Sequence, residues 1–243
     1  EVVLTGIHVA SYGKDRKDIT LTEIIQQVHA VEGIERIRFS SIEPNVVTEE
    51  FAQAMAALPK VCDHFHLSLQ SGCDKTLEQM RRRYDTAQYR RAVALLRKYL
   101  PDVALTTDII VGFPGESEQD YQQSKAFAEE IGFSKIHVFP YSPKKGTPAA
   151  ERKDQLPNAV KQQRSHDLIL ASERMTEAFL QAHVGKEKEV LFERMVSPDV
   201  YEGHTTNYMK VHAKSTEDLT NQCKMVHMLE VEGETAFGEI VKS

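Results

Sequence analysis

The sequence contains few cysteines, no long apolar run and no excess of positive charge, and each of these absences excludes a class of protein. Its three cysteines form neither a short metal-binding pair nor a disulfide framework, which favours reduced thiols. No run approaches the roughly 18 apolar residues of a membrane-spanning helix, and no signal-peptide pattern opens the sequence. With a formal net charge of -6, nucleic-acid binding requires local patches. We therefore expect a cytoplasmic protein without a membrane partner.

What is present is the composition of a globular protein. The chain has 243 residues, of which 41% are hydrophobic and 27% charged, enough for one large domain or two smaller ones. The sequence opens directly on a strand pattern, residues 1–5, with no initiator Met before it. This start leads us to expect a truncated chain that begins within its fold.

In the first 141 residues, short β-rich runs alternate with helical patterns. The runs are residues 1–5, 36–42, 64–70, 104–111 and 135–141. Ser117 opens a capping box at the start of one of the helices between them. Such alternation indicates a parallel sheet with right-handed crossovers. Five strands at this spacing favour an α/β fold, a partial (open) parallel βα barrel.

The pattern changes after Tyr141. A turn-rich connector leads past Pro157 into a long amphipathic helix. The remaining residues show short β-prone runs, which predict a small antiparallel all-β barrel. We place the boundary near His183, giving domains of residues 1–183 and 184–243. The second domain has seven Lys or Arg against eleven Asp or Glu, a net charge of -4, which argues against an electrostatic clamp on nucleic acid.

Polar residues follow the predicted strands, where the loops of a parallel barrel converge. They include His8, Glu43, Gln70 and Asp108. A mouth lined in this way suits a polar, cationic or ribose-bearing ligand. Residues 112–116 form either a tight turn or a backbone cradle for part of a cofactor. Asp108 lies inside an apolar strand, so it serves either a packed hydrogen bond or a ligand.

Three further features have a structural and a functional interpretation. Gly6 is either a turn residue or part of a ligand site. Cys73 has no recognisable base partner, which favours a structural thiol over a nucleophile. The basic residues 81–83 are best explained as a solvated helix face, whereas Lys144 and Lys145 are better candidates for phosphate contact.

Five segments together resemble the radical S-adenosylmethionine (SAM) methylthiotransferases. They are residues 1–12 (EVVLTGIHVASY), 39–44 (FSSIEP), 66–74 (HLSLQSGCD), 106–116 (TTDIIVGFPGE) and 138–147 (VFPYSPKKGT). The resemblance extends along the chain and includes a C-terminal stretch similar to the family's TRAM domain. Within the family, the segments look most similar to the branch acting on N6-threonylcarbamoyladenosine next to the anticodon of tRNA. The branches acting on isopentenyladenosine in tRNA and on a ribosomal protein are close relatives.

The resemblance implies that sulfur is inserted at C2 of the adenine and then methylated. One 4Fe-4S cluster cleaves SAM, a second takes part in sulfur delivery, and another SAM supplies the methyl group. tRNA is the implied partner, and the sulfur donor is not indicated. The family's CxxxCxxC loop and the cysteines of the second cluster are missing from the sequence, so we expect both upstream of Glu1. The chain by itself is then expected to be inactive, without catalytic residues, metal ligands or clusters.

The resemblance also implies which residues contact SAM and substrate. The cofactor-binding residues are Gly6, His8, Glu43, Gln70, Arg82, Asp108, Val111 and Gly112, with Arg82 pairing with the SAM carboxylate. Tyr141, Lys144 and Lys145 lie on the substrate side. Two other hypotheses remain: a non-catalytic tRNA-binding module in which residues 184–243 are the active part, and a different radical SAM enzyme without affinity for tRNA.

Overall fold

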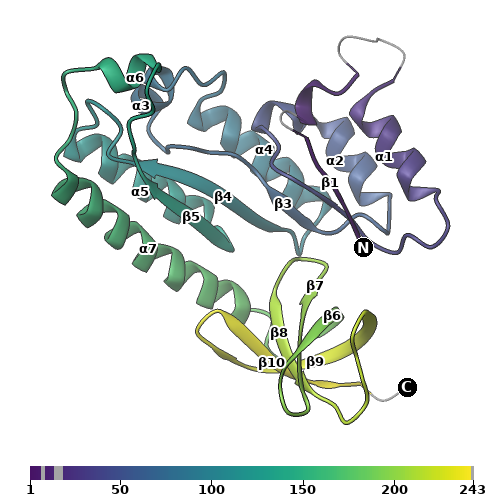
Figure 1. Cartoon of the computed structure of the whole chain (residues 1–243). Helices are drawn as coiled ribbons and strands as arrows, with labels where there is room; N and C mark the ends of the chain where they lie inside the picture. The colour runs from purple at the N-terminus through teal and green to yellow at the C-terminus, as the bar shows by residue number, and fades with distance from the viewer. Residues whose placement is uncertain (7–8, 14–18, 242–243) are drawn as a thin grey trace.

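The first part of the chain is a curved parallel sheet with helices on its outer side (Figure 1). The computed structural model describes residues 1–6, 9–13 and 19–241. The strands are β1 (Val2–Leu4), β2 (Ile37–Phe39), β3 (His64–His66), β4 (Ala104–Val111) and β5 (Lys135–Pro140). β1 pairs with β2, and β4 lies between β3 and β5, all in parallel. Single parallel bridges join the two groups, and the predicted open βα barrel is confirmed.

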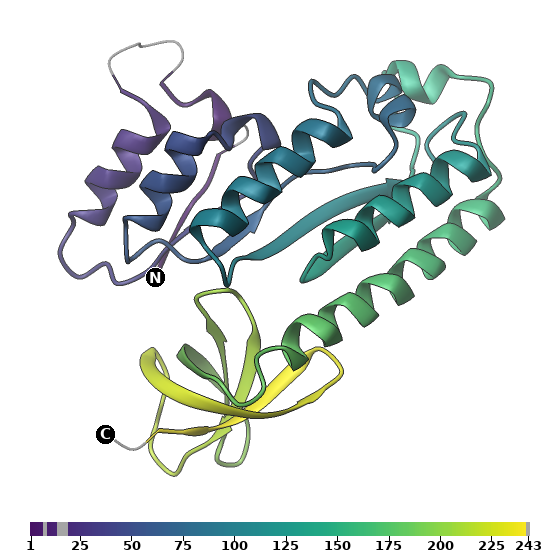
Figure 2. The ribbon, with the colours of Figure 1, turned by 180° about the vertical axis from the view of Figure 1, so that it is seen from behind.

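The helices that connect the parallel strands lie across one side of the sheet (Figure 2). They are α1 (Leu21–His29), α2 (Glu49–Ala56), α3 (Asp74–Gln79), α4 (Thr86–Tyr99) and α5 (Glu118–Ile131). Two further helices, α6 (Pro148–Glu151) and α7 (Asn158–Gln181), follow β5, and the 3-10 turns are η1 (Val9–Ser11) and η2 (Pro44–Val46). The capping box predicted at Ser117 is present at the start of α5. None of the helices in the described residues is long and apolar enough to cross a bilayer.

The two faces of the sheet differ in character, as β4 shows. Leu105, Ile109 and Val111 point towards the helices and are at most 1% exposed. The alternate residues point to the inner, concave face, where the Asp108 side chain keeps 30% of its surface exposed. The apolar core therefore lies between sheet and helices, and the inner face is left for polar side chains.

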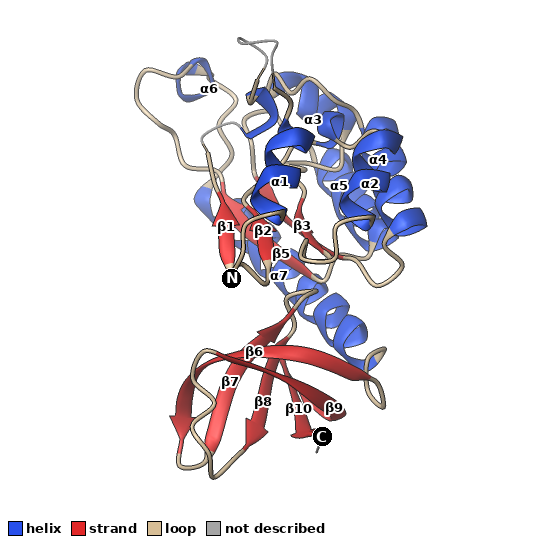
Figure 3. Ribbon diagram, turned by 90° about the vertical axis from the view of Figure 1, so that its right-hand side faces the viewer, coloured by secondary structure: helices blue, strands red, loops and turns tan. Residues whose placement is uncertain are grey.

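The second part of the chain is a closed five-stranded barrel, seen below the parallel strands in Figure 3. Its strands are β6 (Glu187–Ser197), β7 (Val200–Thr205), β8 (Lys210–Lys214), β9 (Gln222–Glu232) and β10 (Thr235–Ile240). The small all-β barrel is thereby confirmed. The domain boundary near His183 stays a prediction, in the stretch between α7 and β6.

The expectation of a wholly antiparallel small barrel is wrong at one pair, because β8 and β10 run parallel. A ring with an odd number of strands cannot alternate direction all the way round, so one neighbouring pair must be parallel. The β-prone runs of the sequence are residues 189–193, 208–212, 225–231 and 237–241, so β7 is missed. Gly203 lies in that strand, and a Cβ there would come within 2.2 Å of Leu191 O, so the position requires glycine.

The two barrels meet through the turn between β7 and β8, which covers the amino ends of β2 and β3 (Figure 1). Arg36 donates to His204 O at 3.1 Å, and Arg38 donates to the carbonyls of residues 205 and 206. Tyr208 in the turn stacks on His64 with ring centroids 4.7 Å apart, and the Arg38 guanidinium lies over the Tyr208 ring. The contact is polar and aromatic, with both arginines buried.

Candidate functional site

Gln70 is held rigidly at the carboxyl end of the sheet. Its backbone N–H donates to Asp108 O at 2.8 Å, and its carbonyl accepts from Ile110 N at 2.9 Å, which extends the pairing with β4. Its φ is 70°, in the left-handed region that residues other than glycine rarely adopt. Such backbone strain clusters at ligand sites, so this outlier supports the position as a binding residue.

Arg82 and Glu43 lie near one another at the same end, beside the phenol of Tyr84. The Tyr84 hydroxyl donates to Leu69 O at 3.1 Å. Burial raises the pKa of Tyr84 to about 12, and the charges of Arg82 and Glu43 act on it in opposite directions. Arg82 Nε is buried and has no hydrogen-bond partner among the described residues. A guanidinium with a free donor is suited to binding a carboxylate.

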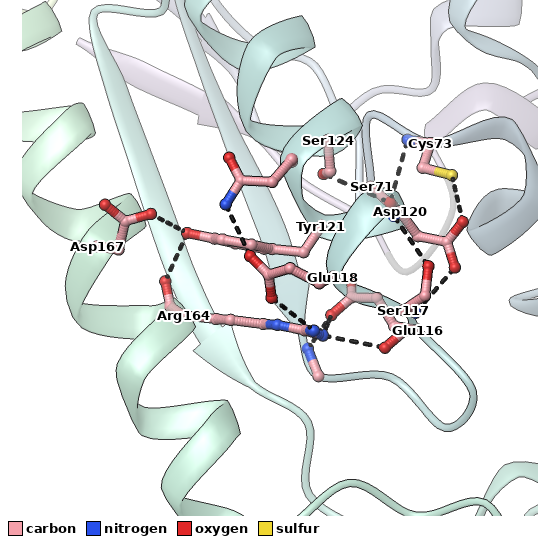
Figure 4. Close-up of polar contacts among 12 residues, drawn as sticks. Ser71, Cys73, Glu116, Ser117, Glu118, Asp120, Tyr121, Ser124, Arg164 and Asp167 are labelled. Atoms are coloured by element: carbon pink, nitrogen blue, oxygen red, sulfur yellow. Dashed lines mark hydrogen bonds and ion pairs between the residues drawn. The ribbon is translucent and has the colours of Figure 1, made fainter.

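A hydrogen bond and a buried ion pair fix the loop between β4 and α5 (Figure 4). Gly112, with φ of 72°, donates its N–H to Glu116 Oε2 at 2.6 Å. Arg164 pairs with the same carboxylate at 2.7 Å, and both side chains are buried. Burial raises the pKa of Glu116, opposed by the Gly112 N–H and Arg164. Because the Gly112 N–H is engaged, this residue can contact a cofactor only through its carbonyl and Cα, which favours the tight-turn interpretation.

Cys73 lies in a hydrogen-bonded network outside the mouth (Figure 4). Its buried thiol lies 3.4 Å from Gln123 Oε1 and 3.7 Å from Asp120 Oδ1, and either oxygen can accept its one proton. Burial opposes the ionisation of Asp120, but hydrogen bonds from Lys75 and Ser117 hold its pKa at about 2. Asp120 is therefore too weak a base to activate the thiol, in keeping with a structural role.

The other predicted site residues are more scattered. The Val111 side chain is buried in the core and Gly6 is exposed beyond β1, while His8 lies outside the described residues. The Tyr141 hydroxyl is buried without a hydrogen-bond partner among the described residues. Lys144 and Lys145 are exposed on the turn after β5. The structure therefore groups Glu43, Gln70 and Arg82 with the strand ends and leaves the two lysines at the surface.

A second group of polar side chains lies deeper, on the inner face of the sheet. His66, Asp108 and His137 place one ligand atom each within 4.8 Å of one another. The neighbouring His66 imidazole holds the pKa of Asp108 below its usual value, and partial desolvation against the sheet lowers the pKa of His137, whose surface is otherwise exposed. Sequence reasoning singled out Asp108 but missed both histidines. His66 opens the segment 66–74 but received no role there, and His137 lies just before the segment 138–147. The only available signal was their alternation with apolar neighbours in two strands.

The small barrel carries an open groove of about 1200 Å³ that is distant from the strand ends. Its charged lining comprises Asp199, Glu217, Glu230 and Glu239 against Lys214 and Lys224. This lining does not form a cationic surface for a phosphate backbone, in line with the net negative charge of residues 184–243.

Comparison with known proteins identifies the family. Residues 1–128 match the model of the Radical SAM superfamily. The solved structure of coproporphyrinogen III oxidase (HemN) from Escherichia coli, a radical SAM enzyme, aligns with a TM-score of 0.50 at 13% identity, covering 79% of this chain and 52% of that one. This likeness concerns the fold alone. The chain belongs to the radical SAM superfamily, whose members use SAM and a 4Fe-4S cluster.

Two curated relatives match over both barrels. The threonylcarbamoyladenosine tRNA methylthiotransferase MtaB of Bacillus subtilis is 38% identical over 234 residues, which are 94% of this chain and 52% of the relative. A tRNA-2-methylthio-N(6)-dimethylallyladenosine synthase of Caldicellulosiruptor saccharolyticus is also 38% identical, over 99% of this chain and 52% of the relative. The chain spans about half the length of the curated relatives it matches.

The described residues fit SAM better than they fit a cluster. Cys62 and Cys73 are buried at separate places in the first barrel, and Cys223 is exposed on the second. None of them belongs to a group of potential metal ligands within the described part of the chain. The unpartnered Arg82 Nε and the fixed Gln70, by contrast, offer polar groups to a charged, ribose-bearing ligand.

Proposed function

We propose that this chain is the SAM- and tRNA-binding portion of a tRNA methylthiotransferase. The reaction is addition of a methylthio group at C2 of N6-threonylcarbamoyladenosine next to the anticodon. The observation that carries the proposal is the extent of the similarity. It covers 94% to 99% of the chain, through the small barrel, in relatives named as a threonylcarbamoyladenosine tRNA methylthiotransferase and a tRNA-2-methylthio-N(6)-dimethylallyladenosine synthase. The segments around Glu43 and Cys73 favour the threonylcarbamoyl substrate over the dimethylallyl one.

The mouth of the open βα barrel, at the carboxyl ends of its strands, would hold SAM. Arg82 Nε, which lacks a hydrogen-bond partner among the described residues, would bind its carboxylate, and Glu43 would accept from the ribose hydroxyls. Gln70, the backbone of Val111 and Gly112, and Gly6 with His8 would complete the contacts. SAM beside a reduced cluster supplies the radical that activates the adenine C2–H bond. We infer two clusters in the whole protein.

Substrate would approach past the turn that follows β5. Lys144 and Lys145 are exposed there and are available to contact phosphates. The Tyr141 ring packs against Phe113, with the two ring centroids 5.2 Å apart. The partner is tRNA, and the proposed setting is the cytoplasm. Contacts of this kind position the nucleic acid without selecting its sequence.

The test uses the full-length protein with reconstituted clusters, SAM, a reductant and tRNA carrying threonylcarbamoyladenosine. Nucleoside mass spectrometry should show the methylthio form of that base. Arg82→Gln should raise the KM for SAM, because the carboxylate loses its cationic partner, whereas the neighbouring, exposed Arg83→Gln should not. Unchanged tRNA together with a modified ribosomal protein would show that the substrate is not threonylcarbamoyladenosine in tRNA.

A further inference from the structure

Three adjacent strands each contribute one metal-ligating side chain to the same inner surface. Asp108 of β4 stands directly opposite His137 of β5, and His66 at the end of β3 lies opposite Thr106, two residues from Asp108. Side chains two residues apart point to the same face of a strand, so the register gathers all three. The imidazole rings of His66 and His137 lie 5.9 Å apart in a stacked arrangement.

The group adjoins the mouth on the inner face of the sheet. Asp108 lies three residues before the end of β4, roughly 10 Å below that strand end at the usual rise per residue. The Gln70 N–H donates to Asp108 O at 2.8 Å, which places Gln70 beside this group, whereas Arg82 and Glu43 belong to loops beyond the strand ends. The three side chains are therefore distinct from those two residues, and a metal ion bound by them would lie next to a ligand held at the mouth.

The ring of His66 is oriented as in a metal ligand. Its Nδ1 is 3.1 Å from Thr106 Oγ1, which leaves Nε2 directed at Asp108. Nε2 is buried, makes no hydrogen bond among the described residues and lies 3.4 Å from Asp108 Oδ2, a distance too long for a good hydrogen bond. Metal-binding histidines are commonly fixed through the other ring nitrogen in this way.

We propose that His66, Asp108 and His137 bind a divalent transition-metal cation of the Zn²⁺ or Fe²⁺ type. Two imidazoles and one carboxylate suit these cations better than Mg²⁺ or Ca²⁺, which prefer oxygen ligands throughout. With metal–ligand bonds of about 2.0 Å, the ligand atoms of a tetrahedral site lie about 3.3 Å apart. The ligand atoms of the three side chains lie within 4.8 Å of one another, so no pair has to close by more than roughly 1.5 Å. The remaining coordination positions face the interior of the half-barrel.

The test is metal binding by the purified 243-residue chain, with Co²⁺ as the spectroscopic probe. A Cys223→Ser background removes the exposed thiol as a competing ligand. One equivalent of Co²⁺ should bind and give visible ligand-field absorption, and excess Zn²⁺ should displace it. Asp108→Asn and His137→Gln should each weaken Co²⁺ binding by more than about 100-fold, and Thr106→Val by about 10–100-fold as the orienting partner.

His166→Gln is the matched control, since His166 is exposed on α7 away from the sheet, and it should bind Co²⁺ as the parent does. Thermal unfolding of the metal-free variants shows that they are folded; His137 is exposed, so its replacement leaves the core intact. Absence of stoichiometric binding, or equal binding by the parent and His137→Gln, would overturn the proposal. These readouts require neither clusters nor tRNA and are therefore independent of the methylthiotransferase assay.

Discussion

At the scale of single residues, the buried ion pair between Glu116 and Arg164 is a contact in the first barrel that we expect to tolerate substitution poorly. Both side chains are almost fully buried, and Arg164 Nη1 also donates to Glu116 O at 3.1 Å. Removing one partner of such a pair leaves an uncompensated buried charge. Arg164→Met should therefore lower the free energy of unfolding by about 3–5 kcal/mol in urea denaturation.

Arg174 on the same helix provides the control for that experiment. Its side chain is 65% exposed and 3.9 Å from Glu129, a surface pair of little energetic value. Arg174→Met should change the unfolding free energy by less than about 0.5 kcal/mol. Equal losses in the two variants would show that the buried pair has no special role.

His64 gives the protein a specific sensitivity to acid. Burial, helped by the charge of Arg38, lowers its pKa from 6.5 to about 3. Below about pH 6.5 the unfolded chain therefore binds a proton at His64 that the folded chain does not bind. The free energy of unfolding is unaffected by this residue above about pH 6.5 and falls by about 1.4 kcal/mol per pH unit from there towards pH 3. His64→Gln should lose less stability than the parent between pH 7.5 and 5.5, measured by urea denaturation at both pH values. A parallel decline of the two proteins would contradict this assignment.

At the scale of elements, the turn between β7 and β8 depends on Tyr208. This residue has φ of 65° and stacks between His64 and His204. Tyr208→Asn keeps a residue that tolerates the left-handed backbone but removes the ring. We expect a loss of about 0.5–1.5 kcal/mol and faster amide hydrogen exchange in β2 and in the turn.

Asp199 provides the control for this element, because it too has a positive φ, 59°, but lies in the β6–β7 turn. Asp199→Asn should leave exchange in β2 unchanged. If both variants loosen β2 equally, the aromatic stack is not what joins the two barrels.

Prediction from sequence succeeded where a local pattern determines the element. β4 was predicted with both ends correct because its apolar run is long and bounded by turn residues, and the α5 cap follows from Ser117 and Asp120 alone. β7 was missed because Gly203 interrupts its β-prone pattern. The inner group of His66, Asp108 and His137 could not be predicted, since it depends on the pairing register of three strands.

At the scale of the whole molecule, the parallel strands and the small barrel were predictable but their contact was not. Alternating strand and helix patterns specify the first, and short β-prone runs the second. The docking of Arg36 and Arg38 onto carbonyls of the β7–β8 turn joins residues far apart in sequence, and no motif signals it. The odd number of strands in the small barrel likewise appears only once β7 is recognised.

Because the β7–β8 turn covers the amino ends of β2 and β3, it limits the routes by which a ligand can reach the inner face of the sheet. With that end obstructed by Tyr208 and its neighbours, a molecule bound on the inner face enters and leaves past the carboxyl ends or past the free edge of β5. A ligand lying across the mouth then obstructs part of the exit. While the mouth is occupied, the edge of β5 is the remaining route for a molecule on the inner face.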